Sequence, residues 1–290
     1  MTTPILRLAI QKSGRLASKS LDILSRAGID VPEYDRLLKI KARDFPLEVL
    51  LLRATDIPEV VADEAADLCI LGQNSLQESM HYFELEELRQ LKFGHCRLSI
   101  AVPQNAPITK VSELAGKSIA TSHPLLLQKY LHKHGTKAQV VPMSGSVEIA
   151  PELAIADAIC DLVSSGSTLQ ANNLRELEPI FHSRAALIAR KGLDGDKRGL
   201  LDEFLLRIDS VSNAFGVKSV TMNAPRDALA TIEDILPGIE SPTVTPLAKE
   251  GWIAIHSIVA EDDEFWHKMR QLKDAGATGI LISPLERVIY

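Results

Sequence analysis

Aromatic residues and cysteine are scarce in this chain of 290 residues. Only 4% of the residues are aromatic, so the cores must be built from aliphatic side chains. The three cysteines, Cys69, Cys96 and Cys160, are too few and too widely spaced for a disulfide framework or a zinc motif. Cys69 and Cys160 lie within apolar runs, which indicates buried thiols in a reduced, cytosolic protein.

The chain also lacks an excess of positive charge and any long apolar stretch. Its 32 Lys and Arg residues stand against 38 Asp and Glu residues, which gives a formal net charge of −6. This balance disfavours nucleic acid or an anionic membrane as a partner, but it leaves room for a local basic pocket that binds phosphates. No apolar run approaches the roughly 20 residues of a membrane helix. The N-terminal MTTPILRLAI has no basic leader, so we expect no signal peptide and a cytoplasmic protein.

Short apolar runs alternate with longer amphipathic segments over the first two thirds of the chain. These runs predict strands within 6–10, 49–54, 67–72, 97–103, 117–121, 138–143, 154–163 and 184–190. Helices are expected between them, including one that ends at Gly135 and one at 169–177. Continuous apolar strands that alternate with helices predict an α/β protein with mostly parallel sheets covered on both faces.

The order of the predicted strands indicates two lobes rather than one large sheet. Residues 97–178 form a self-contained α/β set that is flanked by apolar strands on either side. We therefore expect one lobe from residues 1–96 and 179–211, a second lobe from residues 97–178, and a cleft between them. The two strands that enter and leave the inserted lobe would form the hinge.

The order of predicted strands and helices changes in the last part of the chain, residues 212–290. Its predicted elements follow the order strand, helix, strand, strand, helix, strand, which is the order of a ferredoxin-like unit. The helix expected at 262–275 begins with acidic residues and ends with Lys273 and Gly276, in agreement with helix-dipole and capping preferences. The simplest interpretation of this unit is an oligomerisation module.

Five small residues follow Asp161 and the end of a predicted buried strand. They are Ser164, Ser165, Gly166, Ser167 and Thr168. Backbone N–H groups at the start of a helix, with hydroxyl groups beside them, bind anions, and Gly166 would let the backbone approach a ligand closely. An acidic residue at the end of the strand is expected beside a ribose or a magnesium ion. The alternative is an ordinary helix cap, because Ser and Thr are common at that position.

Three further strand-to-helix junctions carry polar or small residues, at 11–15, 72–75 and 143–148. Ligands of α/β sheets bind at the carboxyl ends of the strands, so these junctions predict a cleft suited to several phosphates. Lys12 and Arg15 would supply cations there, although each could equally be an ordinary surface charge.

Other charged and nucleophilic residues give weaker signals. Arg53 follows another predicted strand, and Asp56 could simply cap the next helix. His132 and His134 are two residues apart, so they would face different directions on a helix. The sequence contains no evident Ser/His/Asp, Cys/His or metal-ligand arrangement. It therefore favours chemistry by positioning and charge neutralisation, such as phosphoryl or glycosyl transfer.

Several segments together resemble the long form of ATP phosphoribosyltransferase, the family that catalyses the first step of histidine biosynthesis. The resemblance covers essentially the whole chain and rests on ILRLAIQKSGRL, RATDIPEVVADEAADLCILGQNSL, MSGSVEIAPELAIADAICDLVSSGSTLQANNL, FHSRAALIAR, SPTVTPLA, GWIAIHSIV and GATGILISP. It implies a two-lobed catalytic part like that of type II periplasmic binding proteins. It also implies that the C-terminal unit is an ACT-like regulatory domain.

The resemblance further implies substrates and site residues. ATP and phosphoribosyl pyrophosphate would react with the help of Mg²⁺ to give phosphoribosyl-ATP and pyrophosphate. The segment from Asp161 to Thr168 would hold phosphoribosyl pyrophosphate, and Lys12 and Arg15 would be catalytic. The nucleotide would lie near Lys12, Arg15, Arg53 and Asp67. The metal ligands stay open, with the substrate phosphates and Asp161 as candidates.

For the C-terminal unit the resemblance implies a sensor of histidine, which would inhibit the enzyme. Asn223, Thr243 and the backbone around Gly279 are the candidate contacts. A homo-oligomer, between a dimer and a hexamer, is implied as well.

Two other functions stay open at this point. A two-lobed solute receptor with an appended sensor would bind without catalysis, although it would need at most one phosphate-type loop. A different phosphoribosyltransferase fold would require an acidic pair just before its phosphate loop. Asp157 and Asp161 are four residues apart, which does not match that pattern.

Overall fold

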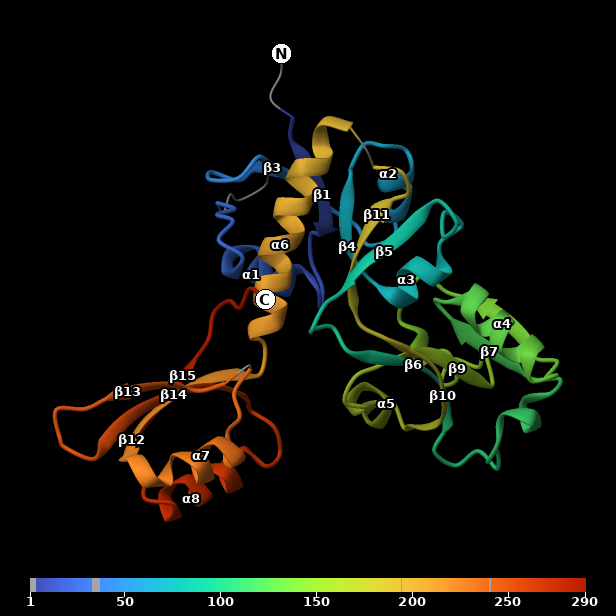
Figure 1. Ribbon diagram of the computed structural model, residues 1–290. Helices are drawn as coiled ribbons and strands as arrows, with labels where there is room; N and C mark the ends of the chain where they lie inside the picture. Colours follow the sequence, from blue (N-terminus) through green and yellow to red (C-terminus); the bar gives the residue numbers. More distant parts are fainter. Residues whose placement is uncertain (1–3, 33–36, 194, 240) are drawn as a thin grey trace. The chain divides into compact units, whose positions relative to one another are not determined.

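The computed structural model describes residues 4–32, 37–193, 195–239 and 241–290 (Figure 1). Residues 1–3 of the N-terminal stretch without a basic leader, and Asp194, lie outside the described residues. Over the described ranges, no helix has the length and apolar character needed to cross a membrane.

The chain forms two compact units. The larger comprises residues 1–25 and 29–202, and the smaller comprises residues 26–28 and 203–290. This division falls within helix α6 (Arg198–Ala214), which also contains the expected boundary between residues 211 and 212.

The first lobe of the larger unit is built on a six-stranded sheet with the order β2-β3-β1-β4-β11-β5. Its strands are β1 (Leu6–Gln11), β2 (Lys39–Lys41), β3 (Leu47–Leu52), β4 (Leu68–Gly72), β5 (Leu85–Gln90) and β11 (Ala185–Arg190). The connecting helices are α1 (Ala17–Arg26), α2 (Ile57–Ala62) and α3 (Gln73–Glu78). Because β1 is parallel to both β3 and β4, the carboxyl ends of these three strands share one edge of the sheet.

The second lobe is built on a five-stranded sheet with the order β10-β6-β9-β7-β8. Its strands are β6 (Cys96–Pro103), β7 (Ser118–Thr121), β8 (Gln139–Pro142), β9 (Ala158–Val163) and β10 (Leu174–Ser183). The connections contain helices α4 (Pro124–Lys133) and α5 (Ser167–Ala171), with short 3₁₀ turns η1 (Val111–Leu114) and η2 (Val147–Ile149). Aliphatic side chains such as Leu98, Ile119 and Leu127 fill the core, as the scarcity of aromatic residues requires.

Two neighbouring segments join the lobes. β6 leads into the second lobe and β10 leads out of it, and the two strands pair antiparallel with Cys96 opposite Ser183. Beyond the ends of this pair, the N–H of Ala185 donates to the carbonyl of Phe93 at 3.0 Å. Gly94 turns the chain here with φ of 71°, a conformation that a Cβ would strain. The second lobe is therefore an insertion held at a two-stranded hinge.

The expectation of mostly parallel sheets is wrong, because both sheets of the larger unit are mixed. β2, β5 and β11 run antiparallel to their neighbours in the first sheet, and β6 and β10 do so in the second. The helix expected at 169–177 is also wrong over its second half, since α5 ends at Ala171 and β10 begins at Leu174. Asn173, in the left-handed conformation with φ of 53°, redirects the chain between them.

The smaller unit contains an antiparallel sheet with the order β13-β14-β12-β15. Its strands are β12 (Val217–Pro225), β13 (Thr243–Pro246), β14 (Trp252–Ala260) and β15 (Thr278–Pro284). Helices α7 (Leu229–Ile235) and α8 (Phe265–Asp274), with the short 3₁₀ turn η4 (Arg226–Ala228) before α7, complete the unit. Figure 1 shows both helices on one face of the sheet, where Met222, Ile255 and Phe265 belong to a common core. The predicted ferredoxin-like arrangement is therefore confirmed.

Candidate functional site

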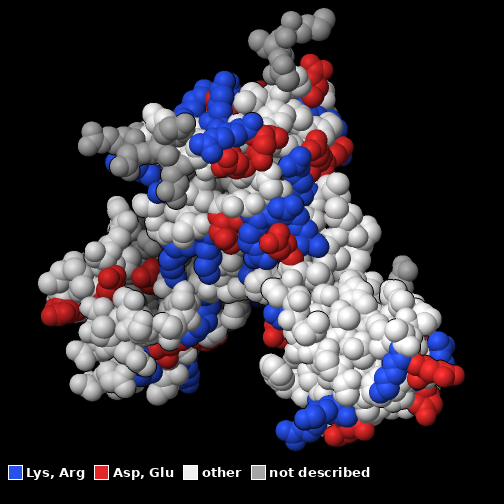
Figure 2. Space-filling view, turned by 90° about the vertical axis from the view of Figure 1, so that its left-hand side faces the viewer, with Lys and Arg blue, Asp and Glu red and all other residues white. Residues whose placement is uncertain are grey.

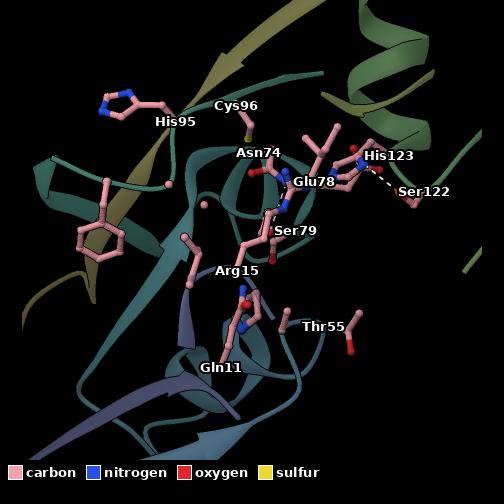
Figure 3. Close-up of a pocket in the computed structure, with 18 of the residues that line it drawn as sticks. Gln11, Arg15, Thr55, Asn74, Glu78, Ser79, His95, Cys96, Ser122 and His123 are labelled. Atoms are coloured by element: carbon pink, nitrogen blue, oxygen red, sulfur yellow. Dashed lines mark hydrogen bonds between the residues drawn. The ribbon is translucent and has the colours of Figure 1, made fainter. Parts of the chain in front are cut away.

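A cleft of about 910 Å³ lies between the two lobes of the larger unit (Figure 3). The first lobe contributes residues after the carboxyl ends of β1 and β4 and in the hinge, including Gln11, Arg15, Gly72, Asn74, Gly94 and Cys96. The second lobe contributes Ser122, His123, Leu162 and Ser164. Clefts at the carboxyl ends of α/β strands are the usual ligand sites of such folds, so this cleft is the candidate site.

The small residues that follow β9 form a loop at the cleft, which we call loop 164–168. Ser164 lines the cleft, and Gly166 caps α5 in the left-handed conformation with φ of 84°. A Cβ on Gly166 would meet no atom within 4 Å, so the backbone faces open space there. The hydroxyls of Ser165 and Ser167 lie 3.0 Å apart. Because α5 is only five residues long, an anion would be bound by the loop's own N–H and hydroxyl groups rather than by a long helix dipole.

Arg15 links the two lobes across the cleft. Its Nη1 atom donates to the hydroxyl of Ser164 at 2.5 Å. Lys12 is exposed, and its backbone N–H donates to the Leu52 carbonyl at 2.8 Å, which fixes the turn after β1. Arg53 directly follows β3 and is exposed near the same edge of the sheet. Three cations therefore follow the ends of β1 and β3, and Arg15 is the one that reaches loop 164–168.

Asp161 lies within β9 rather than after its end, and it is partly buried. Burial raises the pKa of its carboxyl, and the Glu148 carboxylate raises it further, whereas the Leu162 N–H and Arg15 oppose these effects. A carboxylate whose charge is disfavoured by burial and by a neighbouring carboxylate is stabilised by a cation. The described residues include no group of three His, Cys, Asp or Glu side chains that could hold a metal ion. A magnesium ion here would therefore have to take most of its ligands from phosphates, with Asp161 as the candidate carboxylate.

The structure does not bring Asp67 to the cleft. Asp67 precedes β4, whereas the cleft residue Gly72 ends that strand, so the two lie at opposite edges of the sheet. The buried Asp67 carboxylate accepts from the Arg7 N–H at 2.8 Å and from Lys197 Nζ at 2.7 and 2.8 Å. These contacts tie segments of the first lobe together, which makes Asp67 a structural residue.

A polar network close to the hinge connects the lobes, and the sequence analysis missed it. Asn74 Oδ1 accepts from the Ser183 hydroxyl at 2.8 Å, so the Asn74 amide nitrogen faces His123 Nε2, also 2.8 Å away. Nε2 must then be an acceptor, and Nδ1 carries the proton that it donates to Ser122 Oγ at 3.0 Å (Figure 3). The network therefore holds His123 in its neutral form. Its signal in the sequence was only the polar junction at 72–75.

Glu78, the last residue of α3, makes a further contact between the lobes. Its carboxylate accepts from the N–H groups of Leu125 and Leu126 at 2.6 and 2.9 Å. These N–H groups belong to the first turn of α4, where the helix itself supplies no acceptors. Burial nevertheless raises the pKa of the Glu78 carboxyl. The lobes thus meet through Arg15, Asn74 and Glu78.

In the smaller unit, the residues expected to contact histidine lie on the sheet face away from the helices. Asn223 alternates with buried residues along β12, and a Cβ on Gly279 would come 3.7 Å from Asn223 Nδ2. Val244 packs against the core, so Thr243, which precedes it, points to the opposite face. The structure brings Asn223 and Gly279 together, and it places Thr243 on the same face with β14 between them.

Charges of both signs are mixed on the face that Figure 2 displays, where Lys and Arg side chains are bordered by Asp and Glu. Such mixing limits the range of any positive field at physiological salt. Attraction of a phosphate would therefore depend on local cations such as Arg15.

Two family models match the chain in succession. The model for ATP phosphoribosyltransferase matches residues 53–210, and the model for the HisG C-terminal domain matches residues 214–287. The ATP phosphoribosyltransferases of Cytophaga hutchinsonii and Parabacteroides distasonis are 47% and 44% identical to this chain over 285 residues. These alignments cover 98% of this chain and 99% and 100% of the two relatives.

Solved structures share the two-lobed part of the fold. A chain of the ATP phosphoribosyl transferase (HisG:HisZ) complex from Thermotoga maritima has a TM-score of 0.61 and 27% identity, over 71% of this chain and 97% of that chain. The alkanesulfonate-binding protein SsuA from Xanthomonas axonopodis pv. citri, bound to MOPS, has a TM-score of 0.50 and 16% identity, over 72% of this chain and 73% of its own. The second likeness concerns the fold alone, and it confirms the binding-protein-like architecture.

The network around His123 predicts a stability that is sensitive to acid. Burial lowers the pKa of His123 from 6.5 to about 4. The unfolded chain takes up this proton first, so the stability of the neutral network is complete above about pH 6.5 and is lost as the pH falls to about 4. The pKa difference corresponds to about 3 kcal/mol of unfolding free energy.

Urea unfolding between about pH 7 and pH 4 measures this effect. We expect the wild type to lose up to about 3 kcal/mol more than His123→Gln, which has no proton to gain. His123 immediately precedes α4, and the exposed His132 lies near the end of that helix, so His132→Gln is a control that should behave like the wild type. Parallel losses in the wild type and His123→Gln would contradict the account of the network.

Proposed function

Because the chain belongs to the ATP phosphoribosyltransferase family, whose members are transferases of histidine biosynthesis, we propose that it joins ATP to phosphoribosyl pyrophosphate in the cleft. The products would be 1-(5-phosphoribosyl)-ATP and pyrophosphate. One observation carries the assignment of this reaction to the cleft, namely the contact of Arg15 with Ser164 of loop 164–168. A cation from one lobe and a row of hydroxyl and N–H donors from the other thus face the same space.

Phosphoribosyl pyrophosphate carries several phosphates, so its site requires donors rather than a nucleophile. The N–H and hydroxyl groups of loop 164–168 would bind these phosphates, as similar loops do before other helices. Lys12 and Arg15 would neutralise the pyrophosphate group, and Arg53 would contribute to the nucleotide site from the end of β3. Asp67 is left out of the site because Lys197 and the Arg7 N–H occupy its carboxylate.

The reaction displaces pyrophosphate from the anomeric carbon of the ribose. Adenine N1 forms a bond to that carbon while the bond to the pyrophosphate oxygen breaks, so negative charge builds on the leaving oxygen. Arg15 and the loop N–H groups would stabilise this charge, and the loss of one such donor typically costs roughly 3–4 kcal/mol of barrier. Alignment of the two substrates in the cleft lowers the barrier further through proximity. The reaction requires no covalent intermediate with the chain.

The proposal includes a magnesium ion near Asp161 and Glu148, held mostly by substrate phosphates. When bound, the ion would neutralise charge on the pyrophosphate group. Burial and then the Glu148 carboxylate raise the pKa of Asp161, which supports a place for a cation beside this pair.

A two-lobed receptor that binds without catalysis is the main alternative. The likeness to a sulfonate-binding protein supports such a function no further than the shared fold. Family membership and the three phosphate-type junctions that line the cleft, at 11–15, 72–75 and 164–168, favour the transferase.

Incubation of the full-length chain with both substrates and Mg²⁺ tests the proposal. We expect pyrophosphate to be released only when ATP and phosphoribosyl pyrophosphate are present together, because each supplies one reacting atom. Release from either substrate alone, or none from both across a range of pH and salt, would contradict the assignment.

The same assay tests the role of the loop through Gly166→Val. A branched side chain at φ of 84° strains the backbone and occupies the open space, so KM for phosphoribosyl pyrophosphate should rise at least about tenfold. Gly116 has φ of 75° and also faces open space, which makes Gly116→Val a matched control for strain. If the two variants behave alike, loop 164–168 is only a helix cap.

We further propose that the smaller unit senses histidine and that the chain acts as a homo-oligomer, between a dimer and a hexamer. The exposed sheet face offers Asn223, Thr243 and the backbone of Gly279 to an amino acid. Inhibition would then be allosteric, and histidine and substrate would weaken each other's binding by the same factor, typically 5- to 150-fold. Oligomerisation alone is the competing role for this unit.

Thr243→Ala in the full chain tests the sensor. Loss of one hydroxyl contact should weaken histidine binding about 5- to 30-fold in calorimetry and leave the uninhibited rate unchanged. Thr231 is exposed on α7, at the helical face of the same unit, so Thr231→Ala is the control. Absence of histidine binding to the wild type at millimolar concentration would favour the oligomerisation role instead. Unchanged affinity in Thr243→Ala would remove Thr243 from the site.

A further inference from the structure

Arg97 lies where it can reach both loop 164–168 and the hinge. It is the second residue of β6, and in the sheet β6 lies between β9 and β10. β9 leads directly into the loop, and β10 leads from the second lobe back to the hinge. A side chain on the middle strand can therefore connect the loop with a hinge strand.

The guanidinium of Arg97 is held by a carboxylate from β10. Its Nε donates to Glu176 Oε1 at 2.6 Å and its Nη2 donates to Oε2 at 2.5 Å, a two-pronged geometry that only arginine can offer. The Ser99 hydroxyl also donates to Oε1, at 2.8 Å. The Arg97 and Glu176 side chains are only 31% and 25% exposed, so water screens the pair weakly. The hydrogen bonds from Arg97 lower the pKa of Glu176, which keeps the pair charged.

The remaining arm of the guanidinium reaches the loop. Arg97 Nη1 donates to the carbonyl of Ser164 at 3.3 Å. The hydroxyl of the same residue accepts from Arg15 of the other lobe. Arg97 and Glu176 also line a second hollow of about 520 Å³ whose wall includes Ser165 and Gly166. Ser164 is thus fixed at its backbone from one side and at its side chain from the other.

We propose that Arg97, held by Glu176, is a positioning residue that fixes loop 164–168 for phosphoribosyl pyrophosphate, an inference that rests on the proposed function. A loop of small residues has many conformations, and ordering it on binding would cost affinity. The Arg97 contact orders the loop beforehand and ties it to the hinge strands. The contact acts on the phosphate-binding loop and not on the nucleotide, so its loss should raise KM for phosphoribosyl pyrophosphate and leave KM for ATP unchanged.

A direct role for Arg97 as a phosphate ligand makes the opposite prediction for Glu176. If the positive charge of Arg97 attracted phosphate, Glu176→Gln would remove a competing negative charge and strengthen binding. If Arg97 positions the loop, Glu176→Gln would break the two-pronged contact and weaken binding. The sign of this one effect separates the two roles.

The experiment uses the full chain with Mg²⁺ and measures Kd for phosphoribosyl pyrophosphate by calorimetry, with KM for both substrates. We expect Arg97→Lys and Glu176→Gln each to weaken binding at least about tenfold. Arg97→Lys keeps the positive charge but loses the two-pronged contact. Amide hydrogen exchange of the loop should be faster in both variants without any ligand, which tests the holding of the loop independently of catalysis. Arg190, which is 32% exposed, pairs with the Glu64 carboxylate in the first lobe, so Arg190→Lys is a control for an arginine of nearly the same exposure and should change none of these values.

Tighter binding in Glu176→Gln, or unchanged affinity and loop exchange in Arg97→Lys, would overturn the positioning role. An equal rise in KM for both substrates, with a lowered unfolding midpoint, would also overturn it, because that pattern is general destabilisation. A wild type that binds no phosphoribosyl pyrophosphate and releases no pyrophosphate would instead refute the proposed function. Hydrogen exchange of the loop would then show by itself whether Arg97 holds the loop.

Discussion

The antiparallel pairing of β6 with β10 is the constraint on which the cleft depends. These strands carry the chain into and out of the second lobe, and the crossing beside them is closed by a hydrogen bond between Ala185 and Phe93. Close to this crossing, Asn74 forms hydrogen bonds with Ser183 and with His123 of the second lobe, so the polar network joins the two lobes. The strand ends of one lobe are thereby held in a fixed position relative to loop 164–168 of the other lobe.

The proposed site for several phosphates depends on local donors, because the chain as a whole is acidic. Arg15 reaches only as far as Ser164, and the loop offers N–H and hydroxyl groups that need no net charge. Arg97 is neutralised by Glu176, so its proposed role is to order the loop rather than to add positive potential. Such a site binds and aligns anions without a nucleophile, which suits the displacement of pyrophosphate.

Much of the fold follows from local patterns, whereas the site does so only in part. β1, β4 and β9 were predictable because they are buried and therefore have apolar sequences. β5 is an edge strand with the charged sequence LEELRQ, so it lacks the apolar run that predicts a strand. The positions of loop 164–168 and Arg15 after strand ends were predictable from the small and basic residues there, and their binding role stays a prediction. His123 and Asp67 were not, since their roles depend on Asn74 and Lys197, which come from distant parts of the sequence.

Arg15 and loop 164–168 are proposed to act as one site across the cleft. A double-mutant cycle with Arg15→Met and Ser164→Ala, read out as Kd for phosphoribosyl pyrophosphate, tests it most directly. If the two act as one site, each single variant should weaken binding, and the double variant should bind little more weakly than the worse single variant, because both remove the same contact. Losses that simply add would contradict it, since the two residues would then act independently.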